Sequence, residues 1–430
     1  MIIFPTMKSN IWAILLFLCA ALFARGGAVI SESNGIATIS FTNAFFKGVG
    51  TLEQKVGKRW EVMQNFFITS RVAQVSLAVP TNHGALRFKA LDVSPTPLGF
   101  AHLLQAYGNI HTIAGKGEVP VGANGWRPEY EGAFATNVNL SNPQFAMADK
   151  AENIYVVEQD GHAVVKITPD GRIYTVLGTH EAGTNSVRDG DFGTNAQLRF
   201  PTGMWLLDDG TMFVLDAGND RVIRMDSNGI IFFSPAIPFD VVHGARGLWV
   251  APELEGEFYF AAGTELRKYE AASTPPVDLY TGFLNLANVI LNPSDRIIVT
   301  DQGDNRVYRV RSNGEHILQA GNGFTRGLSR GGDAEDVSLP GARGIWYLPT
   351  GGYFVGLDEG ARIWYVDDDE VARPFVKGSP GAHSGDGKWF RAAAVKVGNV
   401  RSVTMTPAGH IIIVEARGFV RKIDFLRHVP

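Results

Sequence analysis

The 430-residue chain contains a single cysteine, Cys19. One thiol cannot form an internal disulfide, so the sequence excludes a small fold held together by disulfide bonds. Basic runs interleaved with aromatic residues are also missing, and the formal net charge is −4. Nucleic acid is therefore not an expected partner, because phosphate recognition needs a concentrated positive surface.

Only one long apolar run occurs, at 11–24, and it follows Lys8. Its length suits the core of a signal peptide and is short for a membrane-spanning helix. We expect residues 1–24 to be a cleaved signal peptide and the protein to be exported to the periplasm or the medium, without membrane attachment after cleavage. Lipid anchoring at Cys19 is the alternative, although bulky residues precede this cysteine where small ones are required.

Residues 30–106 contain alternating apolar stretches at 36–46, 72–80 and 85–93, separated by Gly, Pro, Asn and Ser. Alternation with a period of two is typical of half-buried strands. We predict a small β-rich N-terminal domain here. A short helix or an extended linker follows at 98–108.

From residue 108 to 430 the chain repeats one phrase, in which two short apolar strands flank a polar, Gly-rich turn. The clearest copies read IYVVEQDGHAVVKITPDG at 154–171, FVLDAGNDRVIRMDSNG at 213–229 and IIVTDQGDNRVYRVRSNG at 297–314, with weaker copies at 258–270, 354–370 and 411–425. Such repetition is the pattern of a β-propeller, in which each copy builds one blade. The sequence predicts an all-β fold with six blades over 108–430.

The copies align so that one residue of each innermost strand shares a position: Gln144, Thr202, Arg246, Ala287, Arg343 and Arg401. The last copy has no fourth strand, whereas an isolated strand of that type, GNIHTIAG, precedes the first copy at 108–115. Pairing the two would cover an exposed sheet edge. We expect this N-terminal strand to close the ring by completing the last blade.

The phrase, the TIAGKG and QAGNG segments and the D-x-G-N-x-R-V turn together resemble the NHL-repeat family of six-bladed β-propellers. The resemblance covers about residues 108–430 and is weakest in the third copy, where Ala261 and Thr264 replace the acidic residue and the asparagine. The whole chain looks like uncharacterised exported bacterial NHL-repeat proteins. The resemblance implies the fold and export, and no particular reaction.

Three arginines occupy the aligned inner-strand position: Arg246, Arg343 and Arg401. We expect their guanidinium groups to meet at the mouth of the central channel, on the face with the long loops, and to bind an anion such as a carboxylate or phosphate. His243 would lie beside them. The alternative is internal pairing with the acidic residues that end the middle strands, Glu158, Asp216, Asp301, Asp358 and Glu415. Their recurrence favours turn fastening over catalysis.

Metal ligands are a second class of candidates. Histidines that could lie on the loop-bearing face are His162, His180, His243 and His383, and peptidyl-amidating lyases of similar six-bladed fold hold zinc with histidines. Acidic Gly-rich loops at 189–193, 331–336 and 384–389 offer oxygen ligands for calcium, but none has a complete calcium-loop pattern. We predict no bound cofactor, with zinc and calcium as alternatives, and expect these aspartates to cap turns.

Aromatic residues in the long loops are a third class. Trp126, Tyr130 and Trp389 could stack on a sugar or hold a peptide. With the three arginines they favour a monomeric, non-catalytic protein that binds an anionic carbohydrate or a protein ligand. Two other functions stay open. One is a metal-dependent lactonase or lyase, which a channel metal would mark, and the other is a structural module in an envelope assembly.

Overall fold

The computed structural model describes residues 28–426, apart from 43–46, 81, 118, 121, 185–186, 233–243, 252–256, 271–277, 293, 295 and 328–329. The expected signal peptide, residues 1–24, and the candidate residue His243 therefore lie outside the described part of the chain. The chain divides into two compact units, which we call unit 1 (Met1–Ala106) and unit 2 (Tyr107–Pro430). In the described residues, no helix is both long and apolar enough to cross a membrane.

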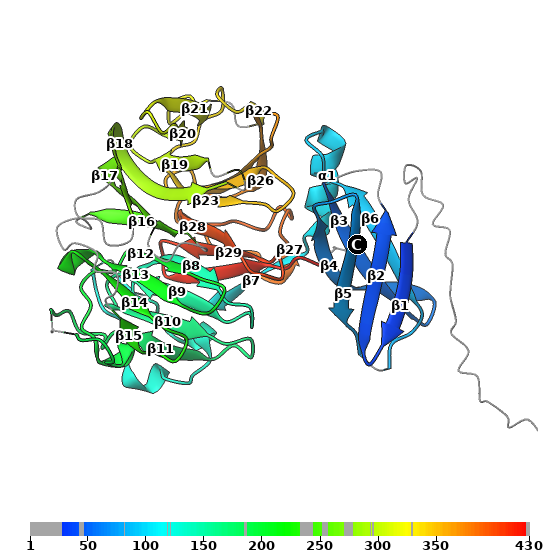
Figure 1. The fold of residues 1–430 in the computed structure, drawn as a ribbon, viewed down its shortest axis with the longest axis horizontal. Helices are drawn as coiled ribbons and strands as arrows, with labels where there is room; N and C mark the ends of the chain where they lie inside the picture. The colour runs from blue at the N-terminus through cyan, green and yellow to red at the C-terminus, as the bar shows by residue number, and fades with distance from the viewer. Residues whose placement is uncertain are drawn as a thin grey trace, which may run out of the picture. The chain divides into compact units, whose positions relative to one another are not determined.

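Unit 1 contains two three-stranded antiparallel sheets and one helix (Figure 1). The first sheet has the order β1 (Ala28–Ser33), β2 (Ile36–Thr42), β5 (Val72–Ala78), and the second has the order β4 (Arg59–Ile68), β3 (Gly48–Val56), β6 (Leu86–Asp92). Alternate residues of β2 are buried, and Phe41 stacks on Phe88 of β6 with ring centroids 5.2 Å apart. The two sheets therefore share one apolar core.

The strands expected at 36–46, 72–80 and 85–93 are confirmed as β2, β5 and β6. The prediction missed β1, β3 and β4. The first six residues of β3 are all buried, so this strand shows no alternation. The segment after β6 forms a helix, α1 (Pro97–Ala106). Its start follows from local chemistry, because Thr96 accepts a hydrogen bond from the Gly99 N–H at 2.9 Å and a proline occupies the first turn.

Unit 2 is built from antiparallel sheets of four, four, six, five and five strands in the described residues (Figure 1). The two four-stranded sheets are β8 (Pro143–Ala148), β9 (Ile154–Glu158), β10 (Ala163–Ile167), β11 (Ile173–Leu177), and β12 (Gly203–Leu206), β13 (Met212–Asp216), β14 (Arg221–Met225), β15 (Ile231–Phe232). The six-stranded sheet is β16 (Ala245–Val250), β17 (Phe258–Tyr269), β18 (Asp278–Leu291), β19 (Ile297–Asp301), β20 (Arg306–Val310), β21 (His316–Ala320).

The two five-stranded sheets each gain a short strand from a long loop. Their orders are β22 (Gly332–Asp333), β26 (Val371–Val376), β25 (Arg362–Val366), β24 (Tyr353–Leu357), β23 (Ala342–Tyr347), and β27 (Lys388–Trp389), β7 (Asn109–Ala114), β30 (Phe419–Ile423), β29 (Ile411–Glu415), β28 (Val400–Met405). The predicted pairing of the N-terminal strand with the last copy is confirmed, since β7 pairs antiparallel with β30. The edge beyond β7 is covered by β27, which the sequence did not reveal.

The innermost strands meet one another in a closed series. Contacts run from β8 to β12, β16, β18, β23 and β28, and from β28 back to β8. The outermost strands β11, β15 and β21 lie at the periphery of unit 2 (Figure 1). The starts of the innermost strands, where the aligned arginines lie, are therefore brought together at the middle.

The third and fourth copies share one sheet, in contrast to the separate sheets expected from the repeat. β17 pairs with β16 through its first half and with β18 through its second half, and the later part of β18 pairs with β19. The polar turn of the repeated phrase lacks its usual residues here, because Ala261 and Thr264 replace the acidic residue and the asparagine. The chain still reverses within β17, because Lys268 Nζ lies 3.3 Å from Glu257 Oε1 and the rings of Phe260 and Tyr269 lie 5.6 Å apart. The reversal is a tight turn at Gly263, whose φ is +56°.

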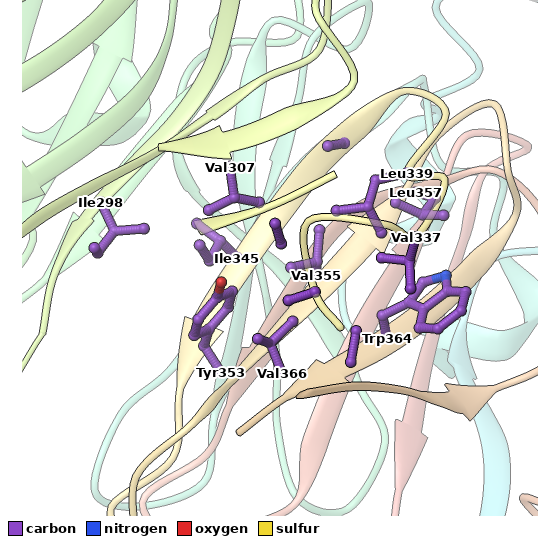
Figure 2. Close-up of a cluster of buried hydrophobic side chains, with 14 of the residues drawn as sticks. Ile298, Val307, Val337, Leu339, Ile345, Tyr353, Val355, Leu357, Trp364 and Val366 are labelled. Atoms are coloured by element: carbon purple, nitrogen blue, oxygen red, sulfur yellow. The ribbon is translucent and has the colours of Figure 1, made fainter. Parts of the chain in front are cut away.

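Apolar layers between neighbouring sheets hold unit 2 together. Figure 2 shows one of them, in which Ile298 and Val307 of the six-stranded sheet share a cluster with Val355, Leu357 and Trp364 of the next sheet. These side chains come from alternate positions on strands whose two faces both pack on other sheets. This explains the nearly continuous apolar runs of the middle strands.

Candidate functional site

A β-bulge marks the aligned position of the innermost strands. In five of the six innermost strands the pairing with the neighbour skips one residue, and the skipped residues are Gln144, Arg246, Ala287, Arg343 and Arg401. In the second copy β12 pairs with β13 without a shift. A bulge leaves its extra residue out of the ladder and turns that side chain away from the sheet. The bulge therefore explains why the side chains of the three arginines point away from their sheets, at the same end of the innermost strands.

The carboxylates at the ends of the middle strands hold the loops that precede the innermost strands. Glu158 accepts a hydrogen bond from the Ser141 N–H at 3.0 Å, Asp216 from the Arg199 N–H at 2.6 Å, and Asp301 from the Leu284 and Asn285 N–H groups at 2.7 and 2.8 Å. These contacts bring the loops against the turns between the middle strands. We call this side of unit 2 the loop face.

Asp358 does not belong to that set, in contrast to the sequence alignment. Leu357 is the residue that pairs with Arg362, as Asp216 pairs with Arg221 and Asp301 with its partner in β20. Asp358 therefore falls one position later, in register with Gln159 and Gln302. A shift of one residue along a strand end exchanges the two faces, so Asp358 is directed to a different partner.

Arg343 is buried and carries its own counter-charge. Its Nη1 donates to Asp358 Oδ2 at 2.8 Å, and its Nη2 donates to Gln144 Oε1 at 2.5 Å. Arg246 donates through Nη1 to Gln302 Oε1 at 3.1 Å. The internal pairing considered from the sequence is thus realised for one arginine, while a neutral amide meets the second.

Arg401 has no hydrogen-bond or ion-pair partner among the described residues, and its Nε is a buried donor without an acceptor. The register explains this, because the position that holds Asp358 in the fifth copy holds Ala416 in the sixth. The side chain is half-buried, so the guanidinium is only partly accessible to solvent. An anion that reached it would meet a donor with no competing partner.

The three guanidinium groups are close enough to influence one another. Burial, followed by the charges of Arg401 and Arg246, lowers the pKa of Arg343 to about 10 against the opposing effect of Asp358. Burial also lowers the pKa of Arg401, with Arg246 adding to the effect and Asp358 and Asp160 opposing it. We call Arg246, Arg343 and Arg401, with Gln144, Gln302 and Asp358, the arginine centre. It holds three cations and one directly paired carboxylate.

The histidine candidates hold loops in place. His180 contacts Gly161 O at 3.1 Å through Nδ1 and Thr175 Oγ1 at 2.9 Å through Nε2. His383 makes the equivalent pair of contacts, with Glu415 Oε2 at 2.9 Å and Thr112 Oγ1 at 3.0 Å. Both rings also stack on an aromatic neighbour, which is Trp126 for His180 and Phe419 for His383. Both imidazoles thus have a partner on each nitrogen.

The aspartates of the acidic Gly-rich loops accept hydrogen bonds from their own turns or pair with a nearby arginine. Asp191 accepts from the Arg188 N–H at 2.8 Å, Asp333 from the Glu335 N–H at 3.2 Å, and Asp386 pairs with buried Arg421 at 2.5 Å. Across the described part of the chain, no group of three or more His, Cys, Asp or Glu side chains is placed to hold a metal ion.

The loop aromatics are only partly exposed. Trp126 stacks in parallel on His180, with centroids 4.1 Å apart, and meets Tyr130 edge-on at 5.8 Å. Trp389 lies in β27, and its Nε1 donates to Tyr107 O at 3.2 Å. One face of Trp126 is therefore occupied, and Trp389 helps to cover the edge of the last sheet.

Residues that the sequence pattern did not indicate also belong to this site. Gln144 and Gln302 accept from the arginines, and Gln144 also donates to Gln159 Oε1 at 2.9 Å. Phe200 lies two residues before the aligned Thr202 and has a left-handed backbone with φ of +47°. Gln144 and Gln302 have no distinctive sequence context of their own. Only an alignment of the copies that covers both the bulge and the turn after the middle strand could have indicated them.

No protein-family model and no curated protein match the sequence. Solved structures do match the fold. A protein of unknown function from Bacteroides thetaiotaomicron VPI-5482 is 13% identical, with a TM-score of 0.58 over 92% of this chain and 97% of that chain. Auxiliary nutrient binding proteins from the same organism and from Bacteroides ovatus ATCC 8483 are 12% and 13% identical, each with a TM-score of 0.54 and the same coverage.

Identities this low show a shared fold. Unit 2 is about three quarters of the chain, so a coverage of 92% means that the shared fold includes part of unit 1. The chain is all-β and β-propeller-like.

Proposed function

We propose that the protein is an exported, non-catalytic binding protein whose loop face recognises an anionic carbohydrate through the arginine centre. The observation that carries the proposal is the unpaired guanidinium of Arg401 beside two further arginines. Cations without a full set of counter-charges are costly to hold together, and an anionic ligand offsets that cost. Two proteins of similar fold are described as auxiliary nutrient binding proteins, which supports a binding role.

The proposal includes finer statements about the architecture. We infer six NHL-type blades over 108–430, a separate β-rich domain at 30–106 and a signal peptide at 1–24, with the mature protein acting as a monomer. The closed series of innermost strands supports the blade number. The pairing of β7 with β30 supports a ring closed by the N-terminal strand. Mass spectrometry of the exported protein would test the cleavage site.

The test uses binding of acidic oligosaccharides, such as trigalacturonate, measured by isothermal titration calorimetry. Arg401→Gln should weaken binding at least tenfold and leave the thermal midpoint nearly unchanged, because this side chain has no partner to lose. Arg311→Gln is the matched control, since that exposed arginine pairs with Glu315 and lies just after β20. Arg343 is unsuitable as a first test, because its removal would leave half-buried Asp358 and buried Gln144 without their donor.

Equal binding by wild type and Arg401→Gln would overturn the proposal. So would the absence of any binding by acidic saccharides, and binding of a protein segment in their place would identify the other ligand class. Stoichiometric zinc or calcium in elemental analysis of the purified protein would favour a metal-dependent lactonase or lyase.

A further inference from the structure

Phe200 is held in a backbone conformation that its side chain disfavours. It lies two residues before the aligned position, where the first and fifth copies have Asn142 and Gly341. All three residues are left-handed, with φ of +47°, +59° and +66°. Glycine and asparagine tolerate this region, whereas the β-carbon of a bulky residue crowds its own backbone there.

The surroundings of Phe200 explain how the strain persists. Its N–H donates to His162 Nδ1 at 3.2 Å, and its ring meets the imidazole edge-on, with centroids 4.9 Å apart. Burial lowers the pKa of His162, which keeps the accepting nitrogen unprotonated. Pro201 follows and restricts the backbone further. Strain that several contacts maintain is typical of functional positions.

The phenylalanine ring is not used to fill the core, since 42% of the residue remains exposed. It also borders the arginine centre. Thr202, two residues later, donates from Oγ1 to Ala245 O at 2.6 Å, directly before Arg246. On the other side, the His162 N–H donates to Gln159 O at 3.4 Å, and Gln159 Oε1 accepts from Gln144, the partner of Arg343. The exposed Phe200 and the arginine centre, which includes Arg401, therefore lie in one region of the loop face.

We propose that Phe200 is the stacking platform for a sugar ring of an acidic saccharide whose carboxylate is bound by Arg401. This inference rests on the proposed function and narrows the ligand to uronic acids. A uronic acid combines an apolar C–H face with a carboxylate on the same ring, which matches a flat aromatic surface beside a guanidinium. A plain inorganic anion would use only the arginines.

The test is Phe200→Asn, which introduces the residue that the first copy has at this position. Relief of the left-handed strain should keep or raise the thermal midpoint, while the affinity for trigalacturonate should fall at least tenfold. Binding of sulfate, which has no sugar face, should be unaffected. Phe192→Asn is the matched control, because Phe192 is 58% exposed and has an extended backbone with φ of −73°. That variant should bind both probes as the wild type does.

The two variants together distinguish the two proposals. If Arg401→Gln loses trigalacturonate binding and Phe200→Asn keeps it, the platform is refuted and the arginine site stands. A lower thermal midpoint in Phe200→Asn would show that the ring is retained for packing, which also refutes the platform. If the wild type binds neither probe, both proposals fail.

Discussion

At the scale of single residues, equivalent carboxyl groups in different copies have different partners, although burial raises the pKa of both Asp216 and Glu158. Asp216 accepts from Arg221 Nε at 2.7 Å and from Asn219 Nδ2 at 2.8 Å. Glu158 faces Ala163 at the position of that arginine, and its Oε2 is buried without a hydrogen bond. Burial raises the pKa of Glu158 to about 8, against the opposing effect of the Ser141 N–H. With this pKa, we expect the carboxyl group to be mostly protonated at neutral pH.

Glu158→Gln should make the protein more stable at alkaline pH. In the wild type the folded-state pKa lies above the ordinary value of 4.5, so the folded state binds more protons between pH 4.5 and about 8. Stability is then lost as pH rises through this window, by up to about 1.4 kcal/mol per pH unit. The variant lacks this loss. Urea denaturation from about pH 5 to about pH 8 should show a flatter profile for Glu158→Gln.

Asp216→Asn is the contrasting variant at the equivalent position. It leaves Arg221 buried without its carboxylate, so we expect the free energy of unfolding to fall by about 3 kcal/mol at every pH in that range. A pH profile of Glu158→Gln that parallels the wild type would show that Glu158 is ionised in the folded protein.

At the scale of elements, the residue after each bulge decides how closely neighbouring innermost strands approach. A β-carbon on Gly344 would lie 2.7 Å from the Val403 N of β28, and one on Gly247 would lie 2.6 Å from the Asn288 Cα of β18. Backbone atoms cannot move aside as the end of a flexible side chain can. The Arg-Gly pairs of the third and fifth copies thus combine a bulge with a close strand contact.

Gly344→Ala should lower the free energy of unfolding by about 1–3 kcal/mol, because the added methyl group overpacks the contact between β23 and β28. The control is Ser402→Ala, which changes the residue after the bulge in the sixth copy. Its hydroxyl is buried without a partner, so the substitution should be neutral or slightly stabilising. Denaturant titration of both variants measures the difference, and equal stabilities would contradict the close-contact explanation.

At the scale of the whole molecule, unit 2 depends on a strand from its own beginning. β7 lies between β30 and β27, and Tyr107 just before it is fully buried against Phe375 and Phe390. A strand added from the start of a unit to its end joins the two ends without a covalent link. Loss of β7 would expose the edge of β30 and open a cavity at the position of Tyr107.

A chain that begins at Tyr107 should therefore fold cooperatively, whereas a chain that begins at Lys116 should aggregate or lose its cooperative transition. Size-exclusion chromatography and thermal circular dichroism of the two truncations would distinguish them. A monodisperse, equally stable protein from the shorter chain would show that β7 is dispensable.

The strands and turns were determined by the sequence itself, because period-two alternation and turn chemistry act between residues close in the chain. The pairing of β7 with β30 also followed from counting strands in each copy. Only the tertiary structure decided which arginine is left without a partner. Arg343 and Gln144 are 199 residues apart, and the one-residue shift that directs Asp358 to Arg343 depends on sheet register. Such contacts arise between copies, where local sequence patterns carry no information about distance.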